Sequence, residues 1–102
     1  MAQMQLEAST EQQVLLVVDD REENLVAMEA LLGDGQWNVR TVDSGEAALR
    51  CLMEEDVGLV LLDVQMPKMD GFEVARLMRG SPHTRHTPVS YTHLTLPTNR
   101  EV

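Results

Sequence analysis

Cysteine and aromatic residues are nearly missing from this sequence of 102 residues. Cys51 is the single cysteine, so the chain can form neither an internal disulfide nor a metal site made of several thiolates. The aromatic side chains are Trp37, Phe72 and Tyr91 alone, so a core must be mainly aliphatic. Such cysteine usage is typical of the reducing cytoplasm, and we expect Cys51 to be a small core residue.

Further absences concern membranes, nucleic acids and nucleotides. No apolar run approaches the roughly 20 residues of a transmembrane helix, and the N-terminus lacks the pattern of a signal peptide. Basic residues number 8 against 17 acidic ones, which gives a net charge of −9. Because phosphate groups repel such a chain, we expect it to bind neither nucleic acid nor an anionic membrane. A glycine-rich phosphate loop is also absent, which disfavours nucleotide binding.

Apolar runs that end in carboxylates are the clearest feature that the sequence does contain. Residues 59–62 are continuously apolar, and Asp63 follows them. A short run of this kind is typical of a strand buried on both faces of a parallel sheet. Residues 14–18 form a second such run, which ends at Asp19 and Asp20. Because open α/β sheets place their ligand sites at the carboxyl ends of strands, the pattern predicts three carboxylates at one edge.

Strand and helix patterns alternate along the chain. Strand patterns occur at residues 13–18, 37–42 and 57–62, and an apolar periodicity of helical type follows each of them. This alternation predicts an α/β fold, in which helices cover both faces of a parallel sheet. Three strand–helix units follow one another in this way.

The predicted helices begin at residues with capping ability. Asp20 is expected to cap the first helix, with Glu23 as its partner three residues later. Ser44 is expected to begin the second helix, and the third is expected to run from Phe72 to about Arg79. The inner face of the first helix is expected to contain Leu25, Met28, Leu31 and Leu32.

Three motifs lie around these elements: Val-Val-Asp-Asp at 17–20, Asp-Ser-Gly-Glu-Ala-Ala-Leu at 43–49, and Leu-Leu-Asp-Val-Gln-Met-Pro-Lys-Met-Asp-Gly at 61–71. In sequence and mutual spacing they resemble the receiver domain of two-component response regulators. The resemblance covers about residues 13–88. It implies a flavodoxin-like α/β fold and a role in phosphorelay signalling. Against the five strand–helix units of a receiver the fold would be incomplete, with three units and the start of a fourth strand at residues 85–89.

The resemblance also implies a role for each residue of the acidic edge. Asp63 would be the phosphoacceptor and a metal ligand, Asp20 a direct ligand to Mg²⁺, and Asp19 a ligand through water. The backbone carbonyl of Gln65 would complete the protein's share of the coordination. A cation suits these residues, because two unit charges ~4 Å apart repel by roughly 4 kcal/mol at an effective dielectric constant of about 20. Mg²⁺ prefers oxygen ligands of this kind. On the residues alone, Asp19 and Asp20 could instead serve only as a helix cap.

Partners and location follow from the same resemblance. A histidine kinase or a phosphotransfer protein would supply the phosphoryl group, and an output domain or a second receiver would be the neighbour in the full protein. The domain would be cytoplasmic and would catalyse only its own phosphorylation and dephosphorylation. Two alternatives stay open, namely a receiver-like interaction module that is never phosphorylated and an inactive fragment. A phosphohydrolase is disfavoured, because Gln65 stands where such enzymes usually carry a second Asp.

The two ends of the chain differ from the region between them. Residues 1–12 are polar and lack periodicity, so we expect a flexible leader before a truncated receiver domain at 13–88. Residues 89–102 are expected to be a non-native tail, because 89–98 are what a transposon-end sequencing adapter encodes when it is read in frame. In that case residues 57–62 would form an unpaired strand edge, which favours aggregation.

The polar residues of the tail are expected to have no functional role. Receiver domains carry a Ser or Thr at the end of the fourth strand and a later Lys. Thr92 comes one residue too early for that hydroxyl, and no lysine follows Lys68. The histidines show no metal-ligand spacing, and we expect all of them at the surface, at positions His83, His86 and His93.

Overall fold

A computed structural model describes residues 12–33 and 35–93 of the chain. Its elements follow the order β1 (Val14–Val18), α2 (Glu22–Leu32), β2 (Asn38–Val42), α3 (Gly45–Glu54), β3 (Val57–Asp63), α4 (Gly71–Arg79) and β4 (Val89–Thr92). The strands and helices predicted from the periodicity are therefore present, with bounds that differ by one or two residues. The predicted leader lies outside the described residues except for Gln12, and so does the tail after His93.

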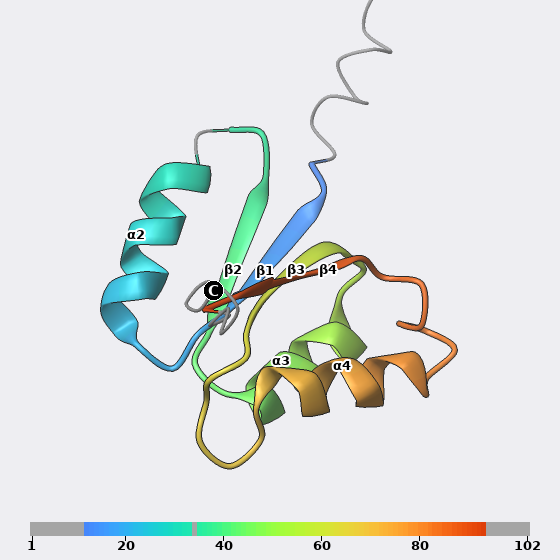
Figure 1. The fold of residues 1–102 in the computed structure, drawn as a ribbon. Helices are drawn as coiled ribbons and strands as arrows, with labels where there is room; N and C mark the ends of the chain where they lie inside the picture. Colours follow the sequence, from blue (N-terminus) through green and yellow to red (C-terminus); the bar gives the residue numbers. More distant parts are fainter. Residues whose placement is uncertain (1–11, 34, 94–102) are drawn as a thin grey trace, which may run out of the picture.

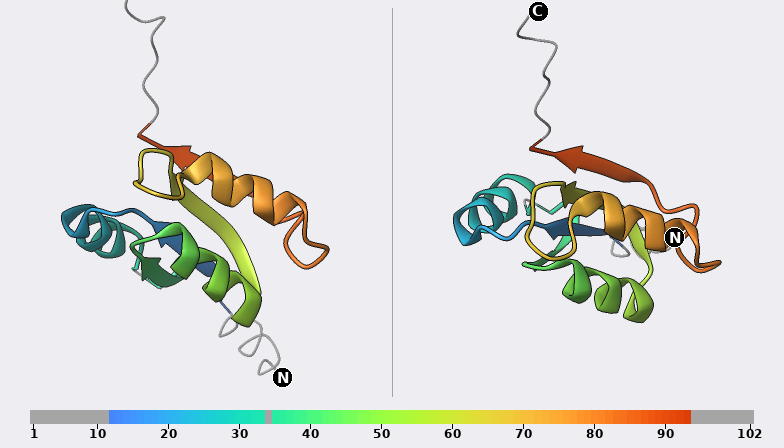
Figure 2. Two further views of the ribbon diagram at one scale, coloured as in Figure 1. Left: turned by 90° about the horizontal axis from the view of Figure 1, so that it is seen from below. Right: turned by 60° about the horizontal axis from the view of Figure 1, so that its bottom comes forward.

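The sheet is parallel and open, with the strand order β2-β1-β3-β4. Helix α2 covers one face of the sheet, and α3 and α4 cover the other (Figure 1). Figure 2 shows from two further sides that β4 forms the outer edge, beside β3. This confirms the α/β fold class with helices on both faces. No helix in the described part of the chain is both long and apolar enough to cross a bilayer.

The core lies between the sheet and the helices α3 and α4. Successive side chains of a strand point to opposite faces, so alternate residues of β1 and β3 enter this layer. Leu16 and Val18 from β1 meet Val60 and Leu62 from β3, and all of these side chains are almost completely buried. The helices contribute aliphatic residues and one sulfur, namely Ala48, Leu52, Val74, Ala75 and Met78. As predicted, the core contains no aromatic residue among those described.

Helix α2 agrees with its prediction only in part, since Leu25, Met28 and Leu32 of the expected inner face are half-buried. No residue of this helix is buried, and Leu31 of the expected inner face is 71% exposed. The physical reason is that α2 lies alone on its face of the sheet, without a second helix beside it (Figure 1). The cap was also wrong, since Arg21 occupies the N-cap position without a side-chain cap bond. Asp20 instead projects at the exposed edge of the sheet.

The other two helices begin with side-chain caps. The hydroxyl of Ser44 accepts a hydrogen bond from the Ala47 amide at 3.1 Å, as the sequence predicted. At the start of α4, Oδ1 of Asp70 accepts a hydrogen bond from the Glu73 amide at 2.9 Å. The next residue, Gly71, is fully packed against the chain, and a Cβ there would collide with the backbone carbonyl of Asp63.

Strand β4 corrects the expectation of an unpaired edge. It pairs in parallel with β3, in a register that runs from Val60 opposite Val89 to Asp63 opposite Thr92. The Val64 amide donates to the Thr92 carbonyl at 3.3 Å. Pairing does not require an apolar strand, because the ladder is made by backbone groups. Residues 89–92 thus contact the folded domain, while the non-native origin of residues 89–102 stays a prediction.

Candidate functional site

The carboxyl ends of β1 and β3 place two acidic side chains next to each other. Val18 and Leu62 are register partners, and the residues that follow them in the chain are Asp19 and Asp63. Both carboxylates are buried, with 5% of Asp19 and 1% of Asp63 exposed. Two neighbouring buried acids are costly unless hydrogen bonds or a cation compensate their charge. This edge of the sheet is therefore the place to look for bound ligands.

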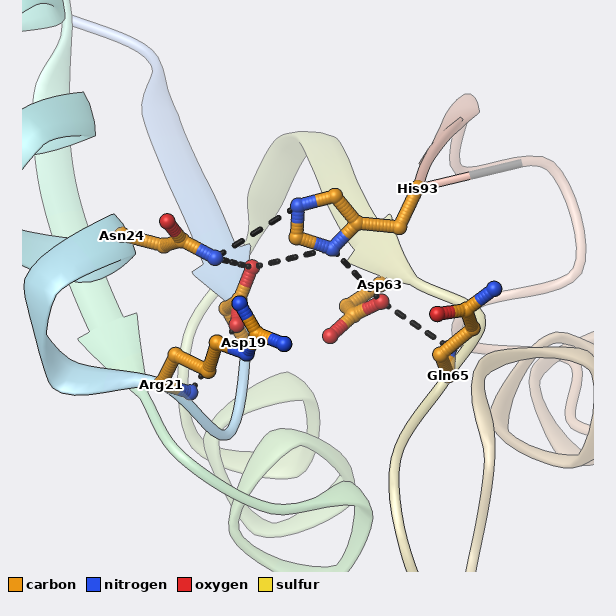
Figure 3. Close-up of polar contacts among 6 residues, drawn as sticks. All are labelled: Asp19, Arg21, Asn24, Asp63, Gln65 and His93. Carbon is orange, nitrogen blue, oxygen red and sulfur yellow. Dashed lines mark hydrogen bonds and ion pairs between the residues drawn. The ribbon is translucent and has the colours of Figure 1, made fainter. Parts of the chain in front are cut away.

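Asp19 is held by the start of α2. Its Oδ1 accepts a hydrogen bond from the Arg21 amide at 2.9 Å, and its Oδ2 accepts one from Nδ2 of Asn24 at 3.1 Å (Figure 3). The first bond spans two residues and forms a turn that leads the chain from β1 into the helix. Asp19 is thus fixed by its local sequence, with one oxygen directed toward the neighbouring strand.

Asp63 is fixed by the loop that follows β3. Its Oδ1 accepts a hydrogen bond from the Gln65 amide at 2.9 Å. Burial raises the pKa of Asp63, the charges of Asp19 and Asp20 raise it further, and the Gln65 amide and His93 act in the opposite direction. A carboxylate in this environment gains from any nearby positive charge.

His93 enters this site from the residue after β4. Its Nδ1 lies 3.1 Å from Oδ1 of Asp63 and 3.7 Å from Oδ2 of Asp19 (Figure 3). Its Nε2 lies 3.4 Å from Nδ2 of Asn24. His93 lies at the surface, as predicted, with 40% of its side chain exposed, but the prediction missed its contacts with the two carboxylates.

The sequence contained one signal for His93. Thr92 stands one residue before the position at which receiver domains carry a hydroxyl, and His93 occupies that position. The other histidines match their prediction. His83 is exposed near the exposed Asp56, at 3.7 Å, and His86 is exposed as well.

The remaining predicted site residues are Asp20 and Gln65, which follow Asp19 and Asp63 closely in the chain. Asp20 is exposed and lines an open cleft of about 680 Å³ together with Asp43 and residues of α2. Gln65 is exposed, and its amide binds Asp63. Lys68 is exposed in the loop before α4 and has a positive φ of 65°.

The donor atoms at the edge suit a small divalent cation. Asp19, Asp63 and His93 each offer one ligand atom, and these atoms lie within 4.8 Å of one another. The two carboxylates fit Mg²⁺, which prefers oxygen ligands. Asp20 is not part of this group of three among the described residues, but its charge acts on Asp63.

Comparisons with known proteins agree with this architecture. Residues 15–95 match the model of the response regulator receiver domain. The response regulator PleD of Caulobacter vibrioides is 44% identical over 75 residues, which are 74% of this chain and 16% of PleD. The sensor histidine kinase GacS of Pseudomonas protegens is 42% identical over 82 residues, which are 79% of this chain and 9% of GacS.

A similar solved structure is the receiver domain of the sensor histidine kinase PA1611 from Pseudomonas aeruginosa PAO1, with a magnesium ion coordinated in its active site cleft. It is 25% identical, its TM-score is 0.76, and the match covers 86% of this chain and 75% of that one. The chain spans less than a fifth of the curated relatives named above.

Proposed function

The chain belongs to the response regulator receiver domain family, and on this premise we propose that Asp63 is its phosphoacceptor. The observation that carries the proposal is the position of Asp63, buried at the carboxyl end of a central strand and next to Asp19. A receiver domain is a signalling module. The proposal gives it one chemical activity, which is its own phosphorylation and the later hydrolysis of the aspartyl phosphate.

Asp63 would take the phosphoryl group from a phosphohistidine. A carboxylate oxygen of Asp63 attacks phosphorus, the new O–P bond forms, and the P–N bond to the donor imidazole breaks. The donor nitrogen keeps the electron pair and can take up a proton. The Gln65 amide, which already binds Oδ1 of Asp63, keeps the carboxylate oriented during the attack.

The proposal includes Mg²⁺, which would be held by Asp19 and Asp63 with Asp20 and the Gln65 carbonyl as further ligands. When bound, the ion neutralises negative charge on the carboxylates and on the phosphoryl oxygens. The adjacent buried carboxylates support this, and so does the magnesium ion in the similar PA1611 receiver domain. Asp19 keeps its place through the Arg21 amide and Asn24, independently of the metal.

Partners and location belong to the same proposal. The donor would be a histidine kinase or a phosphotransfer protein, because relatives include a sensor histidine kinase and a response regulator. An output domain or a second receiver would accompany this domain in the full protein. The domain would work in the cytoplasm, where the lone thiol of Cys51 stays reduced.

A phosphorylation assay with acetyl phosphate tests the proposal. The 102-residue chain is incubated with acetyl phosphate and Mg²⁺, and the label is trapped and located by mass spectrometry. We expect label on Asp63 and none after Asp63→Asn. Asp70→Asn is the matched control, because Asp70 is the helix cap a few residues later and should not accept phosphate. Label on Asp19, Asp20 or Asp70 would refute the assignment.

The alternative function is an interaction module that is never phosphorylated. One observation favours it, namely that the His93 ring already contacts Asp63. The same assay decides between the two, because an unlabelled chain that labels after His93→Ala would mean that His93 blocks the acceptor.

A further inference from the structure

Helix α2, strand β2 and the chain that follows β2 line an open cleft of about 680 Å³. It lies at the side of the sheet where β2 is the edge strand, away from β4 (Figure 1). The cleft has an aliphatic floor and four exposed carboxylates, and no basic residue lines it within the described part of the chain. We infer that this cleft is a docking surface for a basic amphipathic helix of a partner protein. The inference goes beyond the proposed function and does not rest on it.

One wall of the cleft is a single face of α2. Glu22, Leu25, Val26 and Glu29 line the cleft, and their spacing of three, four and seven positions places them on one side of the helix. The two glutamates lie two turns apart, about 10 Å along the helix axis, with the aliphatic side chains between them. Val26 is 59% exposed. This face is therefore apolar in the middle and negatively charged at both ends.

The opposite side of the cleft has the same character. Val42 ends β2 and Ala47 lies in the first turn of α3, and both are half-buried. Asp43 follows β2 directly and adds an exposed carboxylate, as does Asp20 in the turn before α2. An amphipathic helix binds such a groove with aliphatic anchors three, four and seven positions apart, and the burial of those anchors drives the association.

The charges of the cleft define the partner. The side chains of Asp20, Glu22, Glu29 and Asp43 form no hydrogen bond or ion pair with other described residues, so each carboxylate is available to a lysine or an arginine. Complementary charge speeds association and disfavours acidic partners. The same reasoning disfavours a second copy of this chain as the occupant, because a net charge of −9 makes the copies repel each other.

Fluorescence anisotropy with a synthetic peptide tests the inference on the full 102-residue chain in metal-free buffer. The probe is a labelled alanine-based helix that copies the spacing of the α2 face, with lysine at every seventh position and a leucine pair between successive lysines. A scrambled peptide of the same composition keeps the charge and loses the aliphatic stripe. The probe should bind at least about three-fold more tightly than the scrambled peptide. Equal binding of the two would overturn the inference, since attraction to a negatively charged chain would then explain it.

Paired substitutions test the contribution of the carboxylates. Glu22→Gln combined with Glu29→Gln should weaken probe binding at least about three-fold, because two exposed ion pairs are lost. The matched control is Glu23→Gln combined with Glu54→Gln, which removes the same charge from exposed residues that do not line the cleft. This control should change the affinity by less than about two-fold, because water and salt screen distant charges. Circular dichroism checks that both double variants are folded.

The aliphatic contact has its own pair of variants. Val26→Ser removes an exposed aliphatic side chain of the cleft, and Leu31→Ser removes one on the same helix outside the cleft. Only Val26→Ser should weaken probe binding, by about two-fold or more. In NMR spectra of the chain, amide shifts caused by the probe should concentrate at residues 22–29 and 41–47. Shifts confined to α4 or β4, or equal losses of affinity in each variant and its control, would overturn the inference.

Discussion

Asp63 lies buried beside Asp19, and the charge of Asp19 raises the pKa of Asp63 in addition to the larger effect of burial. Both residues follow directly from neighbouring parallel strands, so the fold itself forces the two carboxylates together. The domain therefore carries a site that costs stability until a cation or a proton neutralises it.

The first prediction concerns Asp63→Asn. A raised pKa means that the folded state binds this proton more tightly than the unfolded state, so stability falls as pH rises from the unfolded pKa to the folded one. Above the folded pKa, the ionised Asp63 carboxylate destabilises the folded state to its full extent. The variant should therefore be more stable than wild type at pH 7, because it lacks the buried negative charge.

Denaturant unfolding in metal-free buffer measures this effect. The gain should shrink as the pH falls below both pKa values, because both states of wild type are then protonated. Saturating Mg²⁺ should also remove it, since only wild type keeps the full ligand set. An Asp63→Asn variant that is less stable than wild type at pH 7 without metal would contradict the prediction.

The second prediction concerns the close contact between Gly71 and the backbone of Asp63. A Cβ at residue 71 would collide with the Asp63 carbonyl, and backbone atoms cannot easily move away. Gly71→Ala should lower the free energy of unfolding by about 1–3 kcal/mol. Gly80→Ala is the control, because a Cβ there meets nothing closer than 3.6 Å. Equal stability of the two variants would mean that the contact does not constrain the loop.

The third prediction concerns β4. The Val64 amide donates to Thr92, while the Val60 amide donates to Pro88. Deleting residues 89–102 should thus remove the protection of Val64 against hydrogen exchange but spare that of Val60, whose acceptor remains. The deletion should also lower stability, in contrast to what a non-interacting tail would do. Unchanged exchange at Val64 would show that β4 does not pair in solution.

The fourth prediction concerns the exposed carboxylate at the edge. If Asp20 is a ligand, Asp20→Asn should weaken Mg²⁺ binding by about ten-fold or more in calorimetry. Asp43→Asn removes the same charge from the same cleft and should have a much smaller effect. A similar loss in both variants would mean that Asp20 acts only through the general negative potential.

The local sequence pattern was sufficient to predict the central strands, the meeting of two carboxylates and one helix cap. The apolar runs before Asp19 and Asp63 indicated buried parallel strands, because a strand covered on both faces has no polar face to show in the sequence. Parallel strands bring their carboxyl ends to one edge, so the meeting of Asp19 and Asp63 followed as well. The cap at Ser44 was also predictable, because it depends only on residues within one helical turn.

Only the tertiary structure decided the features that depend on distant neighbours. The exposure of Leu31 depends on which elements lie beside α2, and periodicity does not contain that information. The pairing of β4 depends on backbone groups, to which its polar side chains were a poor guide. The contact between His93 and Asp63 joins residues 30 positions apart in the sequence, and it arises because the register of β3 and β4 sets His93 beside the carboxylate.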